Sequence, residues 1–429
     1  MNNSMFVKID EKQYGPLSKH EIRSLVKKGK FTQNDYVWIE DEDQWAEAGK
    51  IDELRSLFNV GLHALTEKKI IAIGGGKGGV GKTIMSASLG VGLAALGYEV
   101  VLVDADFGGA NLHTAMGLLE PEYTFLDYYT LNRESLDEIS LTTPIPNLRL
   151  ISGACGTLGM ANPKYSQKLR LINELGTLNA DFVILDLGAG SSFTVIDFFL
   201  AVNEGLVIAS PEPTSVQETF DFLKICLIRK LHRTFKDEPE ILSVLNIDGI
   251  DNLSQLTLPV EKLLKKLTDY DKQAGAIFES ILDEFKPRLI LNMVMEPEEI
   301  KEGMALKTAA AELLSIDLDY AGYVEYDDSI RDSVKELRPF ILNNPKSKAS
   351  RSLAKIITIK LLQNRGFQSL KKKIQLQRAI KNSASLYPSA KDRASETICS
   401  VKCFYWDDCE FQKGGYPCGV RHLESLFSK

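Results

Sequence analysis

The stretch Gly74–Thr83, GGGKGGVGKT, decides the fold of this 429-residue chain. It contains the pattern G-x-x-x-x-G-K-[ST] at Gly76, Gly81, Lys82 and Thr83. In such a loop the backbone N–H groups point at a phosphate, the lysine reaches the β- and γ-phosphates, and the hydroxyl is offered to Mg²⁺. The sequence therefore predicts a phosphate-binding loop in which the nucleotide is held by Gly76, Lys77, Gly78, Gly79, Val80, Gly81, Lys82 and Thr83.

The flanks of this loop support the motif. An apolar run, Lys69–Ile73, predicts a buried parallel strand before the loop, and Ile84–Leu96 predicts a helix after it. Similar runs recur along the chain with helical stretches between them, which indicates an α/β protein with a doubly wound, mostly parallel sheet. The further strand candidates are 99–103, 148–151, 182–185, 205–209, 289–294 and 320–322.

One interval does not fit this alternation. Residues 233–287 separate two successive strand candidates by more than fifty residues and contain an amphipathic stretch, Val260–Leu267. We interpret the interval as an inserted helical lobe.

The length and composition of the chain indicate how many domains it has and what class of protein it belongs to. At 429 residues, two or three domains are expected, and 44% hydrophobic with 25% charged residues is typical of a soluble globular protein. The N-terminal sequence lacks the features of a secretory signal, and no apolar run is long enough to cross a bilayer, which predicts a cytoplasmic protein. We expect four segments: an interaction module at 1–60, the nucleotide domain at 68–365, a basic linker or amphipathic segment at 366–395 and a cysteine-rich tail at 396–429.

Carboxylates follow two of the predicted strands. Asp104 and Asp106 end the run VLVDAD, and Asp186 ends FVILD. Ligands of open α/β sheets bind at the carboxyl ends of the strands, so these side chains belong where Mg²⁺ and the attacking water must be held. Asp186 in particular has the pattern of a Walker B aspartate, which binds Mg²⁺ through water.

The loop contains a second lysine, Lys77, where most phosphate loops have none. The form KGGVGKT resembles the deviant Walker A loop of the MinD/ParA family of P-loop ATPases. The resemblance implies slow, Mg²⁺-dependent ATP hydrolysis in a nucleotide-sandwiched dimer, with Lys77 acting in trans on the partner's phosphates and Lys82 in cis. It also implies that Asp106 orients the attacking water and that Asp104 supports the metal shell.

Later segments are similar to one branch of that family. LDLGAG, PEPTS, LNMV and the run Gly322–Ile356 resemble the FlhG/FleN branch, which sets the number and position of bacterial flagella, over most of residues 68–365. In LNMV, Asn292 is the candidate for contacting the adenine edge, although an asparagine at a strand end often only satisfies a turn. The inserted lobe and the added terminal modules depart from the usual layout of the branch.

The first 58 residues resemble a GYF-type domain. A strand is expected at Phe6–Ile9, a turn at Tyr14–Ser18, and helices at 20–28 and 51–58. The resemblance implies that Tyr14, Trp38 and Trp45 form an aromatic surface for a proline-rich peptide. The alternative is that these aromatic side chains are the core of a small domain.

The segment Leu337–Lys391 contains 13 lysine and arginine residues and no acidic residue. Within it, Ser352–Leu362 and Leu370–Ile380 place apolar residues beside lysines. Three interpretations stay open: an anionic membrane surface at the inner face of the cell membrane, a solvated linker, or nucleic acid, which is the less favoured. Four apolar side chains are expected instead in the domain core, namely Leu353, Ile356, Ile357 and Leu361.

Four of the six cysteines lie in the last 31 residues: Cys399, Cys403, Cys409 and Cys418. In a reducing compartment such a cluster favours a metal over disulfides, and either Zn²⁺ or an iron–sulfur cluster is compatible with it. Free thiols are the alternative, and His422 is a substitute ligand.

Together these features predict an ATP-driven dimerisation switch that binds ATP, ADP and Mg²⁺, pairs with a second copy in the presence of ATP, and recruits a protein through its N-terminal module. The switch would position or regulate a cellular assembly, with flagellar or polar machinery as a candidate. A metal-cluster carrier ATPase and a non-hydrolysing, nucleotide-bound scaffold are the alternatives.

Overall fold

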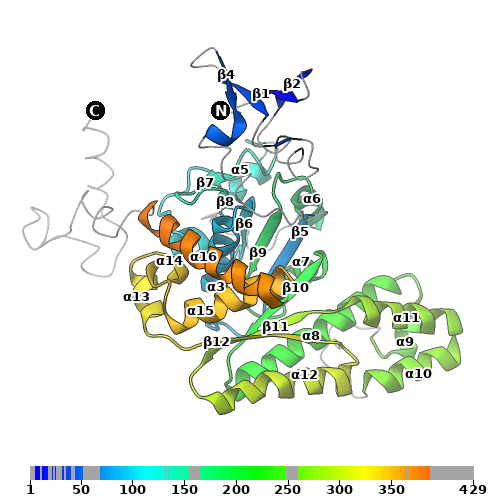
Figure 1. Ribbon diagram of the computed structural model, residues 1–429. Helices are drawn as coiled ribbons and strands as arrows, with labels where there is room; N and C mark the ends of the chain where they lie inside the picture. Colours follow the sequence, from blue (N-terminus) through cyan, green and yellow to red (C-terminus); the bar gives the residue numbers. More distant parts are fainter. Residues whose placement is uncertain are drawn as a thin grey trace, which may run out of the picture. The chain divides into compact units, whose positions relative to one another are not determined.

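The computed structural model is shown in Figure 1. The structure describes residues 5–9, 12–17, 22, 25, 31–32, 35–39, 44–51, 68–130, 132–133, 135–153, 165–247, 259–363 and 366–386. Contacts divide the chain into two compact units, Met1–Ala384 and Ser385–Lys429. Only the first two residues of the second unit are described, so Cys399, Cys403, Cys409, Cys418 and His422 lie outside the described residues.

Within the described residues, the larger sheet has eight strands in the order β12-β11-β10-β5-β9-β6-β8-β7. All neighbouring pairs are parallel except β7 with β8. The strands are β5 (Lys69–Gly74), β6 (Val100–Ala105), β7 (Leu141–Thr142), β8 (Leu148–Ile151), β9 (Phe182–Leu187), β10 (Glu204–Ala209), β11 (Arg288–Val294) and β12 (Asp319–Glu325). The predicted doubly wound α/β sheet is confirmed, and the short edge strand β7 is an addition.

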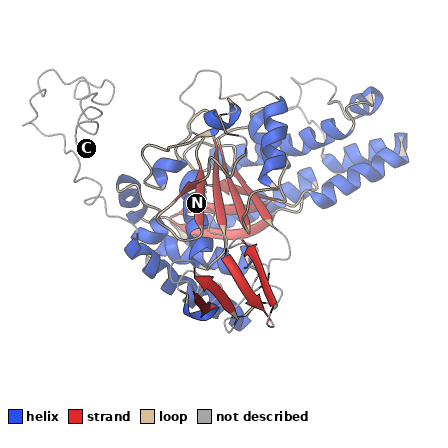
Figure 2. Ribbon diagram, turned by 90° about the horizontal axis from the view of Figure 1, so that it is seen from above, coloured by secondary structure: helices blue, strands red, loops and turns tan. Residues whose placement is uncertain are grey.

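The central strands are apolar because both faces of the sheet are covered. Every residue of β6 and β9 is buried, and Figure 2 shows helices on both sides of the sheet. One face carries α3 (Lys82–Ala95), α14 (Phe340–Asn343), α15 (Lys348–Lys355) and the π-helical η4 (Ile356–Leu361). The other face carries α7 (Phe193–Leu200), α8 (Pro213–Thr234) and α12 (Ile300–Leu314). Leu353, Ile356, Ile357 and Leu361 are buried, as expected.

Shorter helices follow several strands: α4 (Leu112–Ala115), α5 (Phe125–Tyr129), α6 (Tyr165–Leu175) and α13 (Ser329–Lys335). The interval 233–287 is helical where it is described, with α9 (Pro239–Val244), α10 (Val260–Tyr270) and α11 (Lys272–Glu284). Helix α11 packs against α8, α10 packs against α12, and α9 packs against α10 (Figure 1). Lys230 of α8 pairs with Glu284 of α11 at 3.3 Å. The lobe therefore extends the helical layer that contains α8.

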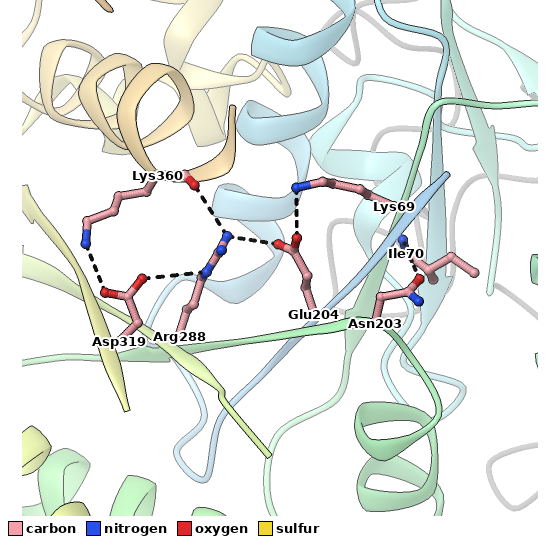
Figure 3. Close-up of polar contacts among 7 residues, drawn as sticks. All are labelled: Lys69, Ile70, Asn203, Glu204, Arg288, Asp319 and Lys360. Carbon is pink, nitrogen blue, oxygen red and sulfur yellow. Dashed lines mark hydrogen bonds and ion pairs between the residues drawn. The ribbon is translucent and has the colours of Figure 1, made fainter. Parts of the chain in front are cut away.

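An ion-pair chain joins the first residues of four strands (Figure 3). Glu204 accepts from Lys69 at 3.0 Å and from Arg288 at 2.9 Å. Asp319 pairs with Arg288 at 3.6 Å and with Lys360 of η4 at 2.9 Å. These residues start β5, β10, β11 and β12, so the chain fixes η4 to the end of the sheet opposite the phosphate loop.

The N-terminal residues form a separate antiparallel sheet of order β2-β1-β3-β4, with β1 (Met5–Ile9), β2 (Lys12–Leu17), β3 (Tyr36–Ile39), β4 (Gln44–Glu47) and the 3₁₀ turn η1 (Ala48–Lys50). The turn predicted at Tyr14–Ser18 is wrong for Tyr14–Leu17, because this segment pairs with β1 as a strand. The buried cluster of the module contains Val7, Ile22, Phe31, Val37 and Ala48. The helices predicted at 20–28 and 51–58 fall almost wholly outside the described residues.

The basic segment contains α16 (Gly366–Leu386). Leu376 and Ile380 are buried on one side of this helix, whereas Leu370 and Ile374 are 55% and 44% exposed. Among the described helices, none combines the length and hydropathy needed to cross a membrane.

Candidate functional site

The phosphate loop lies between β5 and α3, and its glycines are required by close contacts. Gly79 and Gly81 have φ angles of 77° and 91°, in the left-handed region that favours glycine. A Cβ added at Gly76 would lie 2.2 Å from the carbonyl oxygen of Glu218, and one at Gly81 would lie 2.6 Å from Nδ2 of Asn292. The loop is therefore seated on α8 on one side and on the end of β11 on the other.

Lys82 is the first residue of α3 and is directed into the loop. Its Nζ donates to the carbonyl oxygen of Lys77 at 3.0 Å, and the residue is 7% exposed. Burial lowers the pKa of Lys82, while the charges of Asp186 and Asp106 act in the opposite direction. A lysine in this position is ready to exchange a backbone carbonyl for the more strongly charged oxygens of a phosphate.

Asp186, at the end of β9, is bonded to the first turn of α3. Its Oδ1 accepts from the Ser86 hydroxyl at 2.8 Å, and the Thr83 side chain also hydrogen-bonds to the carboxylate. Burial raises the pKa of Asp186 to about 6, against the lowering effect of these bonds and of Lys82. Ser86 was missed by sequence reasoning. Its position four residues after Lys82, one helical turn along the same face, is the signal that could have found it.

Asp104 lies directly beside Asp186, since the two residues are register partners on β6 and β9. Asp104 is fully buried and accepts from the backbone N–H of Asp106 at 3.2 Å and of Leu112 at 3.0 Å. Burial, with the nearby charge of Asp186, raises the pKa of Asp104 to about 8. The site thus holds a buried pair of carboxyl groups, which a cation would stabilise in ionised form.

Asp106 lies on the loop after β6. Its Oδ1 accepts from the N–H groups of Gly108 at 3.3 Å and Gly109 at 3.0 Å. A Cβ added at Gly188, in the loop after β9, would lie 3.0 Å from the same oxygen. Asp106 therefore lies where the loops that follow β6 and β9 approach each other.

Lys77 is directed away from the phosphate cradle. Its Nζ pairs with the carboxylate of Glu212 and donates to the hydroxyl of Thr214 at 2.8 Å. Both partners belong to the start of α8, with Glu212 as its N-cap residue. The two lysines of the loop therefore have different partners, Lys82 inside the cradle and Lys77 at its surface.

Asn292 lines a pocket of about 210 Å³ together with Gly81 of the phosphate loop and Tyr326. Its Nδ2 donates to the carbonyl oxygen of Val80 at 2.8 Å, which fixes the orientation of the amide. Its Oδ1 is buried and has no hydrogen-bond partner among the described residues. The pocket wall formed by the segment after β12 was not predicted from the sequence.

The donors at this site fit Mg²⁺. Mg²⁺ prefers oxygen ligands and is usually held by one or two carboxylates together with waters and substrate phosphates. The Thr83 hydroxyl and the carboxylates of Asp186 and Asp104 supply such oxygens. Among the described residues, no three His, Cys, Asp or Glu side chains are grouped so as to hold a metal alone. This is the expected arrangement for a cation that arrives with a nucleotide.

The predicted aromatic residues belong to the N-terminal module. Trp38 and Trp45 are cross-strand partners whose rings make an edge-to-face contact with centroids 5.4 Å apart. Tyr14 is 46% exposed. None of the three belongs to the buried cluster formed by the described residues of the module, and Trp38 and Trp45 are half-buried.

Residues 71–340 match the family model described as CobQ/CobB/MinD/ParA nucleotide binding domain, and residues 6–54 match GYF domain 2. The antiactivator FleN of Pseudomonas aeruginosa is 29% identical over 285 residues, which cover 66% of this chain and 82% of FleN. The flagellum site-determining protein YlxH of Helicobacter pylori is 27% identical over 263 residues, covering 55% and 87% of the two chains.

Septum site-determining protein MinD of Synechocystis is 31% identical over 208 residues, covering 46% of this chain and 75% of MinD. Among solved structures, MinD of Pyrococcus horikoshii in complex with Mg-ADP is 20% identical, with a TM-score of 0.47, and covers 69% of this chain and 98% of its own.

Proposed function

The chain belongs to the CobQ/CobB/MinD/ParA nucleotide-binding family and is an ATPase that uses Mg²⁺, and from this premise we propose that it is an ATP-driven dimerisation switch. The switch positions or regulates another cellular assembly. Two similar proteins, an antiactivator named FleN and a flagellum site-determining protein, support flagellar machinery as that assembly, since the similarity covers more than four fifths of each.

The observation that carries the proposal is the different placement of the two loop lysines. Lys82 is buried in the cradle and suits the phosphates of the nucleotide bound by its own chain. Lys77 is held at the surface by Glu212 and Thr214, with 27% of its side chain exposed. In the proposed dimer, Lys77 leaves these partners and reaches the phosphates bound by the second copy.

Roles for the remaining site residues follow from their contacts. The N–H groups of residues 76–83 hold the phosphates, because the left-handed glycines turn the backbone toward the cradle. Thr83 and Asp186 hold Mg²⁺ directly or through water, and Asp104 supports that shell. Asp106, at the approach of two loops, orients the attacking water.

The pocket beside Asn292 is proposed as the adenine site. The Oδ1 of Asn292 is a buried acceptor without a described partner, and the 6-amino group of adenine is a donor. Guanine has a carbonyl oxygen at the same position and would leave two acceptors facing each other. The arrangement therefore favours ATP over GTP.

Two further contacts are proposed. The exposed Tyr14 with the Trp38–Trp45 pair would bind a proline-rich segment of a protein partner. The exposed apolar residues of α16, Leu370 and Ile374, lie among lysines and would contact an anionic membrane at its cytoplasmic face. The metal-carrier alternative depends on Cys399, Cys403, Cys409 and Cys418, which lie outside the described residues.

Solution mass by light scattering tests the proposal. The wild type is expected to be dimeric with Mg·ATP and monomeric with Mg·ADP, and Asp106→Ala should prolong the dimer by slowing hydrolysis. Lys77→Ala should bind ATP but stay monomeric, whereas Lys286→Ala, at an exposed position of the lobe, should behave as the wild type.

A dimer that forms equally with Mg·ATP and Mg·ADP would contradict the proposed switch and favour the nucleotide-bound scaffold. Loss of ATP binding in Lys77→Ala would show that Lys77 acts in cis. Either outcome contradicts the trans role.

A further inference from the structure

A second pocket, of about 500 Å³, lies away from the phosphate loop, between the edge strand β12 and the helices α15, η4 and α16. Its volume is in the range of small-molecule sites. The lining has two kinds of wall: basic side chains on the helices, and an apolar floor that includes Ile356 and Ile359.

The basic wall carries charge that the described residues do not neutralise. Arg351 and Lys355 are one turn apart on the same side of α15, and Lys373 faces the pocket from α16. None of these three side chains forms a hydrogen bond or ion pair within the described part of the chain. Lys360 also lines the pocket, but it is bonded to Asp319 (Figure 3).

One carboxylate belongs to the lining. Glu325 accepts from the Ser352 hydroxyl at 3.4 Å and is not paired with a lysine or arginine of the pocket among the described residues. The pocket therefore has a net positive charge, even with Lys360 counted as neutralised by Asp319.

A buried lysine precedes Lys373 in α16 without lining the pocket. Lys372, the neighbour of Lys373, is 7% exposed, and its Nζ has no hydrogen-bond partner among the described residues. Burial lowers its pKa, with the charge of Lys371 as a smaller cause. A lowered pKa means that this amine holds its proton less firmly, so Lys372 is not counted in the charge of the pocket, which rests on Arg351, Lys355 and Lys373.

Phosphate is the anion that this lining suits best. Arginine binds phosphate oxygens in a bidentate manner, and lysine binds them as a point charge. An acidic peptide added to the free edge of β12 is disfavoured, because Gly322 has a φ of 137° and the register of β12 shifts beside it. We propose that this pocket binds the phosphate group of an amphipathic molecule, whose apolar part contacts Ile356 and Ile359.

Two sources share this chemistry, a free phosphate ester and the headgroup of an anionic phospholipid. The first source is independent of the function proposed above. The second rests on the proposed membrane contact of α16, because Ile359, Leu370 and Ile374 are exposed apolar side chains on η4 and α16.

The test uses the full chain saturated with Mg·ADP, so that the phosphate loop is filled. Phenyl phosphate is titrated by calorimetry, and in parallel the protein is sedimented with vesicles of phosphatidylglycerol or of phosphatidylcholine. Arg351→Gln and Lys373→Gln are expected to weaken binding about tenfold or more, because each removes a charge-assisted bond. Lys381→Gln, an exposed α16 position outside the pocket lining, is the matched control and should bind as the wild type.

Binding of phenyl phosphate with this variant dependence supports a free ester as the ligand. Binding of phosphatidylglycerol vesicles alone, with the same dependence, supports a lipid headgroup. No binding of either probe, equal weakening by Lys381→Gln, or binding of polyglutamate in place of both probes would overturn the proposal. Affinity for a fluorescent ADP, measured on every variant, separates this outcome from a failure of the nucleotide site.

Discussion

Asp104→Asn tests the charge state of the nucleotide-free site. Asp104 is fully buried, and its pKa is raised from 3.8 to about 8. A carboxyl whose folded-state pKa is raised contributes most to stability below the unfolded pKa, and this contribution is lost as pH rises through the window from about 4 to about 8. Above pH 8 no further loss is expected.

The magnitude follows from the two pKa values. Within the window the wild type should lose about 1.4 kcal/mol of unfolding free energy per pH unit through this group. At pH 7 the accumulated loss is about 4 kcal/mol, since the group is still mostly protonated in the fold and fully ionised when unfolded. Asparagine does not titrate, so the variant should lack this slope.

Asp104→Asn also removes a hydrogen-bond acceptor, which destabilises the fold. Asp104 accepts one N–H on each oxygen, from Asp106 and from Leu112. The amide nitrogen of asparagine cannot accept, so one buried N–H loses its partner at a cost of about 1–3 kcal/mol. This cost is independent of pH, and the diagnostic quantity is therefore the slope and not the offset.

Urea unfolding followed by far-UV circular dichroism at pH 5.5, 6.5 and 7.5 measures the slope. Asp283→Asn, at an exposed position of α11, is the control and should remain parallel to the wild type. The stability of Asp104→Asn relative to the wild type should rise by about 2.5 kcal/mol from pH 5.5 to 7.5, slightly less than two full units of slope because the folded carboxyl begins to ionise near pH 7.5. Saturating Mg·ADP should flatten the wild-type slope, because Mg²⁺ stabilises the ionised carboxylates. Parallel curves for wild type and Asp104→Asn would refute the argument.

Three other substitutions have defined outcomes. Gly76→Ala places a Cβ 2.2 Å from the Glu218 carbonyl oxygen and should lower the melting temperature by several degrees. In the control Gly78→Ala, the Cβ would have no neighbour closer than 3.8 Å, so the melting temperature should not change. Equal melting temperatures for the two variants would contradict the packing of the loop on α8. Asn292→Ala should reduce the preference for ADP over inosine diphosphate about tenfold, measured by competition against a fluorescent ADP, and an unchanged ratio would remove this residue from the base site. Arg288→Gln breaks the ion-pair chain of Figure 3 and should lower the free energy of urea unfolding by about 1–3 kcal/mol. High salt should reduce this difference from the wild type only slightly, because the chain is partly buried. A difference that disappears at high salt would show instead that the chain is a screened surface interaction.

The sheet and the phosphate loop were predictable because their signals are local. The run FVIL is apolar on both faces, which is typical of a strand covered on both sides, and Gly79 and Gly81 of the loop have left-handed φ angles. Tyr14–Leu17 was not predictable in the same way. Its Gly15-Pro16 pair is typical of a turn, and only the pairing with β1 makes it a strand.

The missing parts of the site depend on contacts between residues far apart in the chain. Ser86 matters because Asp186, 100 residues later, accepts its hydroxyl. Asn292 was a candidate from the sequence, but its bond to a carbonyl oxygen 212 residues earlier was not predicted. The pocket beside Asn292 is closed by the segment after β12, whose sequence has no nucleotide signature. Composition indicated a solvated or lipid-facing basic segment, yet Lys372 is buried. Such contacts are created by the fold and have no local pattern.

The contact that holds Lys77 is weak in comparison with what the proposed dimer offers. Lys77 and Glu212 are 27% and 63% exposed, and ion pairs with that exposure stabilise by only about 0–1 kcal/mol. A triphosphate with Mg²⁺ on the second copy presents more negative charge in a less hydrated setting. We infer that little free energy is needed to release Lys77, so its ion pair with Glu212 does little to oppose dimerisation. Control of the switch must then lie in the nucleotide: loss of the γ-phosphate removes the stronger partner, and Lys77 returns to Glu212. Glu212→Gln should accordingly change the lifetime of the ATP dimer less than threefold, whereas Asp106→Ala should prolong it far more.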